Sequence, residues 1–534
     1  MKVPTATKGE GSPVTVRFLA ETDTARDIRA YVATSIRDIL TAAETVQQDI
    51  VDKILAKASG SFLWVRLSLK SLRQSCHTRD DIDKALTGLP AGMVGLYEQM
   101  LAKLLSQPER TQSLAHMILS WVSCSWRPLG LEELQLALEP TFTGFLNLED
   151  TVNQICAHFV TTDNGKITLI HDTARQFLTA NQATRIAFIQ PRQAHLQIAE
   201  RCLGYLSQDS WPRTFHAIST ADADPKRGIR SNRLLLAEQG APLLGYATCY
   251  WAYHVSKSPT ASTEITSALK VFFSSYCLSW IEAIALSANL RYLTRSARYL
   301  KAYAKRKKHA RMHKDSSPVL DSLTKLPEDD PKWLQSWAID LIRLVGKFGS
   351  ILLAKPPAIH QDIIPFCPKG SMFTLTYGEQ KAGQLTVTGL PSDGWDDRLA
   401  RVSVGDDYIA SQVLATESYF VTLISTIGRI LVWHTETCEK ARQIEVGEYV
   451  AVVRLNNSGT MLATASLSHC AVWELSSGRS TSRIDNSTTK RIIAISFANN
   501  DPHLVIGSDD CSITVHDLST SSICLLYTSP SPRD

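Results

Sequence analysis

Several familiar chemistries have no signature in this sequence of 534 residues. It contains no G-x-x-x-x-G-K-[ST] phosphate loop, no H-E-x-x-H zinc helix and no G-x-S-x-G nucleophile turn. The eleven cysteines stand singly without a C-x-x-C pair, which favours reduced, buried thiols over a disulfide framework or a zinc site. We therefore expect no catalytic residue and no metal site in this chain, and we do not expect it to be an enzyme.

Excess charge and long apolar runs are also scarce. The net charge is +4, which is too small to make nucleic acid a general partner. No uninterrupted apolar stretch reaches the roughly 20 residues of a membrane span, because Glu282, Arg343 and Lys347 interrupt the best candidates. The N-terminus lacks the apolar core of a signal peptide. We expect a folded, cytoplasmic chain without a membrane partner, and a nuclear location stays open.

The length and the 44% of hydrophobic residues fit several folded domains, at roughly 150 residues each. Residues 24–106 have the apolar spacing of helices. Phe62, Val65, Leu69 and Leu72, for example, recur at steps of three and four. We interpret 1–110 as a helical region.

Residues 111–190 combine helix patterns with one strong turn signal. Three helix patterns precede Asn164-Gly165, a pair typical of type I′ hairpin turns, and a helix follows, with Asp172 as its expected N-cap. Helices followed by a hairpin and a helix predict a winged-helix domain. Its candidate recognition helix, Gly130–Glu139, has three glutamates and no basic residue, which disfavours DNA binding.

Residues 191–364 read as a helical, solenoid-like domain and linker with an aromatic core. Four tryptophans lie in helical patterns: Trp251, Trp280, Trp333 and Trp337. The run Lys301–Lys314 has seven Lys or Arg and no acid. It is either a solvated helix end with its linker, or a contact for RNA, anionic lipid or an acidic partner, or a nuclear import signal. It is the one candidate for a nucleic-acid contact, and we do not expect nucleic acid as a partner.

Alternation typical of strands begins after residue 365. Trp433 and Trp473 lie 40 residues apart in similar contexts, and a third copy ending in His516-Asp517 lies 43 further on. WD repeats run about 40–45 residues, each giving a four-stranded blade. We interpret 365–520 as a partial WD40 β-propeller, with Trp433, Trp473 and Asp517 at structural positions. Trp395 is a candidate for an earlier, degenerate blade.

Three blades are fewer than the four to eight with which propellers close, so we expect the propeller to continue beyond this chain. The last segment, 521–534, is expected to be a tail of non-native appearance whose Ser/Pro-rich end fits no blade.

Four stretches occur in the order found in one protein family: LAKASGSFLWVRLSLKSL, LTGLPAGMVGLYEQML, ILSWVSCSWRPLGLEELQLAL and ICAHFVTTDNGKITLIHDTARQFL. The chain resembles fungal NACHT-type STAND NTPases of the vegetative-incompatibility kind, which are related to animal NLR receptors. The resemblance covers roughly residues 20–520. It implies a multidomain fold, α and then β: the C-terminal helical part of a NACHT region, a winged helix, a helical arm and a partial WD40 propeller.

In that family a P-loop and a Walker B acid hold the nucleotide, and both would lie upstream of residue 1. The resemblance therefore implies ATP or ADP for the complete parent protein and no cofactor in this chain. A winged-helix histidine of the family contacts the β-phosphate of ADP in the context H-x-[ST]-x-x-[DQ]-F-L, which His171 to Leu178 match. The alternative is a structural His171 that anchors the wing. Gly60-Ser61-Phe62 lacks the proline of the family's adenine-side Gly-x-Pro, which puts an adenine contact there in doubt.

Two function hypotheses follow. In the first, the chain is the regulatory and sensor portion of a NACHT–WD40 signal-transduction protein. Its winged helix controls the NTPase switch and its propeller recognises proteins or a ligand, while oligomer formation by the complete protein stays open. In the second, it is a non-enzymatic helical and WD40 scaffold adaptor.

Overall fold

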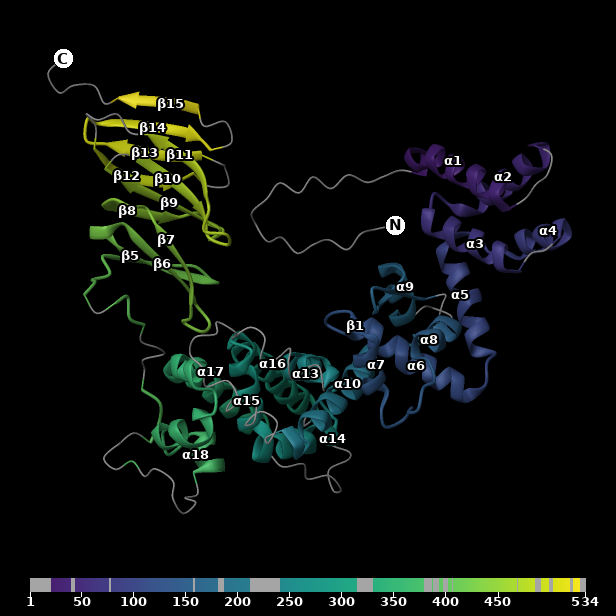
Figure 1. Cartoon of the computed structure of the whole chain (residues 1–534), viewed down its shortest axis with the longest axis horizontal. Helices are drawn as coiled ribbons and strands as arrows, with labels where there is room; N and C mark the ends of the chain where they lie inside the picture. Colours follow the sequence, from purple (N-terminus) through teal and green to yellow (C-terminus); the bar gives the residue numbers. More distant parts are fainter. Residues whose placement is uncertain are drawn as a thin grey trace.

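The fold is a series of helical elements followed by antiparallel sheets, which trace an arc in Figure 1. The computed structural model describes these residues: 21–39, 44–75, 78–156, 159–180, 187–211, 241–314, 330–378, 387, 393–396, 402–405, 407–467, 469–485, 491–498, 503–518 and 522–528.

The first part of the chain is helical, as its apolar spacing predicts. Val65, Leu69 and Leu72 of the predicted apolar face are buried, whereas Phe62, at its start, is 42% exposed. Thr78 begins α4 (Arg79–Gly88) with a capping box that also uses Asp81. The helices are α1 (Glu21–Ile39), α2 (Glu44–Ala58), α3 (Phe62–Ser75), α4 (Arg79–Gly88) and α5 (Gly92–Leu105).

The next elements have the arrangement of a winged helix. They are α6 (Glu109–Cys124), β1 (Leu129–Gly130), α7 (Leu131–Leu138), α8 (Leu148–Cys156), β2 (Val160–Asp163), β3 (Lys166–Leu169) and α9 (Asp172–Thr179). The strands form one sheet in the order β1-β3-β2. Asn164 and Gly165 both have positive φ, 49° and 71°, which confirms the predicted hairpin turn. Glu133 accepts from the Gly130 N–H at 2.8 Å and pairs with Arg127, so it fixes the start of α7.

The helical arm follows and has a tryptophan core. Trp251, Trp280 and Trp337 are at most 2% exposed, and Trp251 packs edge-on against Trp280 with ring centroids 5.4 Å apart. The arm consists of α10 (Pro191–Leu206), α13 (Pro242–Lys257), α14 (Thr263–Val271), the π-helix η1 (Phe272–Tyr276), α15 (Cys277–Leu286), α16 (Arg291–Lys314), α17 (Asp330–Ala354), the short helices η2 (Ile359–Ile363) and η3 (Ile364–Phe366), and α18 (Met372–Tyr377).

The sequence predicts strands after residue 365, but helical packing continues beyond this point. Phe373 of α18 is fully buried against Trp337. The expectation that Trp395 belongs to an early blade is wrong. Its indole N–H donates to Asp340 of α17 at 2.6 Å and its ring lies under the Lys347 ammonium, so Trp395 belongs to the arm.

One stretch, Thr263–Leu286, is long and apolar enough to cross a membrane by length and composition. In the structure 72% of its window is buried inside the protein, as expected for a core helix. Glu282, at 1% exposure, pairs there with His360 at 2.9 Å.

The C-terminal part forms three antiparallel sheets of four strands each, with strands in sequence order. The first contains β4 (Gln412–Ala415), β5 (Tyr419–Ile424), β6 (Arg429–His434) and β7 (Lys440–Glu445), with the 3-10 helix η4 (Ser425–Ile427) after β5. The second contains β8 (Val450–Leu455), β9 (Met461–Ser466), β10 (His469–Glu474) and β11 (Ser480–Asp485). The third contains β12 (Ile492–Phe497), β13 (His503–Ser508), β14 (Ser512–Asp517) and β15 (Ser522–Thr528).

The sheets stack face to face through shared apolar cores. One core joins the first two sheets, where Val432 and Leu462 are fully buried, and another joins the second and third, where Val472 and Leu504 are fully buried. The β5–β6 turn also approaches the next sheet closely. A Cβ on Gly428, at φ 61°, would lie 2.0 Å from the Glu448 carbonyl oxygen, so only glycine fits there.

The expectation that 521–534 fits no blade is wrong for residues 522–528. This segment is β15, which pairs with β14 from Ser512↔Thr528 to Asp517↔Ser522. The run SICLLYT is rich in β-prone residues, and its backbone completes the ladder of the third sheet. The Ser/Pro-rich residues 529–534 lie outside the described residues.

Candidate functional site

His171 lies at the first turn of α9, as its sequence context predicts, but its local role differs from the prediction. His171 itself is the N-cap, where Asp172 was expected: its Nδ1 accepts from the Thr173 backbone N–H at 3.2 Å. Thr173 Oγ1 also contacts Tyr97 of α5 at 3.0 Å, so the cap is tied to the N-terminal helices. Asp172 pairs instead with Arg175 at 2.5 Å.

The cap fixes the protonation of the His171 ring. Because Nδ1 accepts a hydrogen bond, the neutral ring carries its proton on Nε2. The residue is exposed, so this N–H donor is accessible at a helix N-terminus. The geometry therefore establishes a structural role and leaves one donor for an anionic partner.

A chain of hydrogen bonds, buried on the side of the arm, joins the winged helix to the arm. The Trp126 backbone N–H, just after α6, donates to the Tyr246 hydroxyl of α13 at 3.0 Å. Tyr246 Oη lies 2.8 Å from His254 Nε2, and His254 Nδ1 lies 2.8 Å from His195 Nδ1 of α10. We call these four residues the junction relay.

Each contact in the junction relay has one donor and one acceptor when all three hydrogen bonds are donated in the same direction along the series. Tyr246 accepts from Trp126 and donates its own proton to His254 Nε2, so His254 carries its proton on Nδ1 and donates it to His195. Both histidines are then neutral. Burial holds the pKa of His254 well below its usual value, with His195 adding to the effect. Burial and the nearby Lys257 ammonium lower the pKa of His195 to about 4.

The sequence alone did not predict this pair, because His195 and His254 lie 59 positions apart. No local spacing signals such a contact. A polar residue on an otherwise apolar helix face is the single sign that the sequence offered.

The predicted repeat positions occupy equivalent places in the three sheets. The indole N–H groups of Trp433 and Trp473 donate to Thr422 and Thr464 on the preceding strands, at 3.0 and 3.1 Å. His516 takes this position in the third sheet, where its Nε2 lies 3.1 Å from Thr514 of its own strand.

Each of these aromatic residues also follows a register shift towards the last strand of its sheet, at Val432/Trp433, Val472/Trp473 and Val515/His516. Asp517 lies next to His516 at the end of β14, opposite His503 and Ser522. The shared shift shows that the 40- and 43-residue spacing reflects one repeated structural unit.

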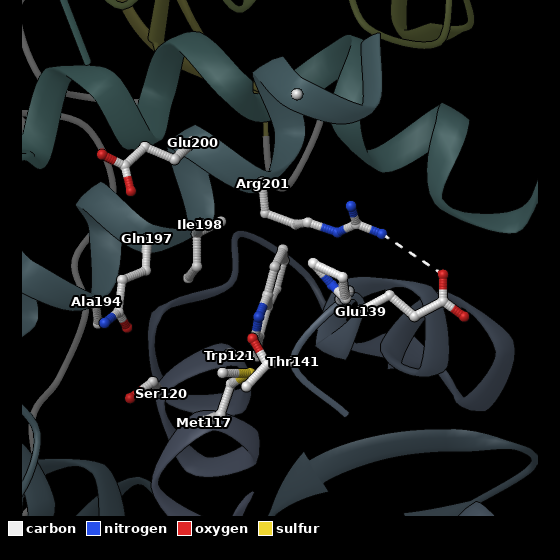
Figure 2. A pocket seen from close by; sticks show the side chains of 13 residues that line it. Met117, Ser120, Trp121, Glu139, Thr141, Ala194, Gln197, Ile198, Glu200 and Arg201 are labelled. Carbon is white, nitrogen blue, oxygen red and sulfur yellow. Dashed lines mark ion pairs between the residues drawn. The ribbon is translucent and has the colours of Figure 1, made fainter. Parts of the chain in front are cut away.

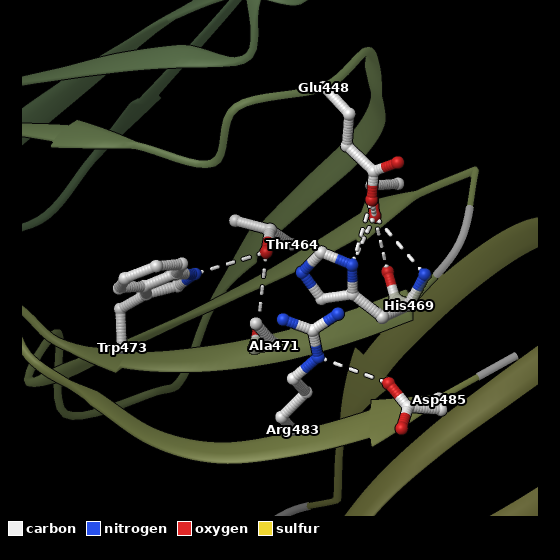
Figure 3. Close-up of polar contacts among 8 residues, drawn as sticks. Glu448, Thr464, His469, Ala471, Trp473, Arg483 and Asp485 are labelled. Atoms are coloured by element: carbon white, nitrogen blue, oxygen red, sulfur yellow. Dashed lines mark hydrogen bonds and ion pairs between the residues drawn. The ribbon is translucent and has the colours of Figure 1, made fainter.

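Figure 3 shows His469 facing Glu448 at the start of the second sheet, where Ser466 completes a Ser–His–Glu cluster. His469 Nδ1 lies 2.7 Å from Glu448 and 3.2 Å from Ser466 Oγ, which also bonds to Glu448. A catalytic triad needs the serine and the acid on opposite ring nitrogens, whereas here both face Nδ1. The cluster therefore fixes the β9–β10 turn against the β7–β8 turn and has no nucleophile geometry.

The β6–β7 turn meets the first turns of α16. Glu436 pairs with Arg298 at 2.5 Å and accepts from the Thr294 hydroxyl at 3.4 Å. Glu439 of the same turn is half-buried, and burial raises its pKa. We call the Arg298–Glu436 contact the hairpin clasp.

The basic run on α16 is only partly solvated. Arg306 donates to the Ser256 and Ser258 carbonyls at the end of α13, where a cation complements the helix dipole. Lys307 is 6% exposed and contacts Thr266 at 2.6 Å. Lys301, Lys305 and Lys308 are exposed.

The cysteines that the structure describes are unpaired and mostly buried, and burial raises the pKa of Cys156, Cys202 and Cys470 to about 12. Within the described ranges, no three His, Cys, Asp or Glu side chains are grouped to hold a metal ion.

A family model described as "GPI inositol-deacylase, winged helix domain" matches residues 102–188. The match covers the elements from α6 to α9, so a winged-helix domain is present. No curated protein matches the sequence.

Solved structures match over about a quarter of the chain. "Structure of U3-55K" is 17% identical with a TM-score of 0.23, and "Crystal structure of RRP9 WD40 repeats" is 18% identical with a TM-score of 0.23; each match covers 24% of this chain. "KlHsv2 with loop 6CD replaced by a Gly-Ser linker" is 18% identical with a TM-score of 0.21 over 23%. The matched part spans 42% of each of those chains. TM-scores this low do not define a fold.

Proposed function

We propose that this chain is the regulatory and partner-binding portion of a NACHT–WD40 signal-transduction protein of the fungal NLR-like kind. In this proposal the winged helix reports the state of an NTPase core to the helical arm, and the sheets are blades of a WD40 propeller that binds partner proteins. The chain itself has no catalytic role, and it acts in the cytoplasm.

The observation that carries the proposal is the junction relay. A winged helix that transmits a state must move together with the element that it controls. Tyr246, His254 and His195 of the arm, all three buried, are hydrogen-bonded in series to the Trp126 backbone N–H beside α6. This coupling favours a regulatory part over a set of independent binding modules.

His171 fits the proposed nucleotide contact. Its Nε2–H is accessible, its ring is held by Thr173, and it stands at a helix N-terminus that favours an anion. The neighbouring Asp172 carboxylate would oppose a phosphate, but Arg175 pairs with it. Bound ADP would supply the phosphate charge, and His171 would donate one hydrogen bond to it.

ATP hydrolysis by the purified 534-residue chain tests the non-catalytic assignment. We expect no turnover above a protein-free blank, and clear turnover would refute the assignment. The His171 contact needs a homologue that includes a P-loop, in which the equivalent His→Ala change should shorten ADP retention. A matched change at the equivalent of His116, a winged-helix histidine packed on Phe188, should leave retention unchanged.

The scaffold adaptor is the second candidate, and the repeated sheets favour it. Stacked antiparallel sheets offer binding surfaces without any nucleotide link. If ADP retention is the same with and without the His171 equivalent, the scaffold function becomes the better account. Affinity capture with the 407–528 sheets alone and with the full chain would then recover the same partners.

A further inference from the structure

A cavity of about 390 Å³ lies between the winged helix and the arm, where α6, the segment after α7 and α10 meet (Figure 2). Its volume is within the range of small-molecule sites in proteins. Most of its lining is apolar: Met117, Trp121, Ala137, Pro140, Ala194 and Ile198.

Trp121 supplies a donor that is aimed at the cavity, and the buried hydroxyl of Ser120, which also lines it, has no hydrogen-bond partner among the described residues. Trp121 is 3% exposed and packs edge-on against Tyr246 with ring centroids 6.0 Å apart. Among the described residues its indole N–H has no hydrogen-bond partner. Figure 2 shows the ring reaching into the space below Arg201, with its nitrogen towards Thr141. This N–H therefore faces the open space of the cavity and is available to an acceptor bound there.

The charged groups around the cavity exclude an anionic ligand. The Arg201 guanidinium is committed, because its Nε donates to the Leu136 carbonyl at 3.0 Å and it pairs with Glu139 at 3.9 Å. Glu200 stands at the rim with its carboxylate turned away from Trp121 in Figure 2. Burial, with Glu264 nearby, raises the pKa of Glu200, so its surroundings disfavour further negative charge.

We propose that this cavity binds a small, neutral, largely apolar molecule whose carbonyl or similar acceptor takes the Trp121 indole hydrogen bond. One wall is winged helix and the other is α10 of the arm, so the ligand also holds the two together. A ligand that binds only the folded junction stabilises it by mass action.

Two probes of similar shape distinguish apolar filling of the cavity from the hydrogen bond to the Trp121 indole. Acetophenone carries a carbonyl acceptor, and isopropylbenzene replaces that carbonyl by a methyl-bearing carbon. By titration calorimetry on the full chain we expect acetophenone to bind at least about tenfold more tightly than isopropylbenzene. Trp121→Phe keeps the apolar ring and removes the donor, so it should abolish this preference while both probes still bind.

Gly204 allows the cavity to be filled without strain. It lines the cavity, and a Cβ built on it meets no atom within 4 Å. Gly204→Leu should abolish binding of both probes, whereas Gly88→Leu, at an equally open glycine of α4, should change neither. The proposal is overturned if neither probe binds the native chain, if the two bind equally, if Trp121→Phe keeps the preference, or if Gly204→Leu binds as before.

Discussion

The helical half and the sheet half of the molecule are held together in different ways. A single apolar core runs through the helical elements, from Ile28 of α1 to Phe373 of α18. The sheets have three smaller cores of their own, and none shares a buried residue with the helical core. The junction relay lies inside the first region, whereas the hairpin clasp lies between the two.

The two junctions therefore differ in how firmly they hold the elements on either side of them. Buried hydrogen bonds in low dielectric are strong and directional, so the winged helix and the arm behave as one cooperative unit. The hairpin clasp is an ion pair with a 61% exposed Arg298 side chain, and such pairs contribute little to stability. The sheets are therefore attached by contacts that a partner can replace.

Removing the side chain at the centre of the arm core should have the largest effect on stability, and it should act on the helical half alone. Trp251 is fully buried among Phe272, Phe273 and Trp280. Trp251→Ala should destabilise the helical half by about 3–5 kcal/mol, because it loses apolar contact and leaves a cavity. Scanning calorimetry should show the helical transition at lower temperature and the sheet transition unmoved.

Leu462→Ala is the matched change in the sheets. Leu462 is fully buried in the core between the first two sheets, and its truncation should lower only the other transition, by about 2–5 kcal/mol. If either variant moved both transitions together, the two halves would be one cooperative unit.

Acid should weaken the helical half through the junction relay. His195 has a folded pKa of about 4 against about 6.5 unfolded, so the unfolded chain binds more protons in between. The contribution of His195 to the free energy of unfolding is fully present above pH 6.5. It is lost as the pH falls towards 4, by about 3 kcal/mol in total. Urea unfolding from pH 7 to 4 should show this loss in the native chain and a smaller loss in His195→Asn. Equal slopes would remove the relay as the cause.

Tyr246→Phe removes one hydroxyl from the junction relay and keeps the ring. It leaves the Trp126 N–H and the His254 Nε2 without their shared partner, which should cost about 1–3 kcal/mol. Tyr449→Phe, at a 40% exposed tyrosine of the sheet half, should stay within about 0.5 kcal/mol. Urea unfolding measures both, and equal effects would show that the relay hydroxyl contributes nothing special.

Local patterns predicted the elements well because their causes are local. The turn at Asn164-Gly165 and the repeat around Trp433 and Trp473 depend on residues close in sequence. Trp395 was misplaced because strand-like turn residues surround it, whereas its partner Asp340 lies 55 positions away. The same limit hid the junction relay and the cavity, since both are made where separate elements meet.

The hairpin clasp should give the smallest effect on stability and the clearest effect on arrangement. Arg298→Ala should change neither calorimetric transition by more than about 1 kcal/mol. It should nevertheless broaden the distance distribution measured by small-angle X-ray scattering, because Glu436 no longer holds the β6–β7 turn on α16. Arg483→Ala removes an exposed pair with Asp485 inside one sheet and should leave the scattering unchanged.

Since salt screens exposed charges, 1 M NaCl should broaden the distance distribution of the native chain and should add no broadening to that of Arg298→Ala. If salt leaves the distance distribution of the native chain unchanged, apolar contact and not the hairpin clasp joins the sheets to the arm.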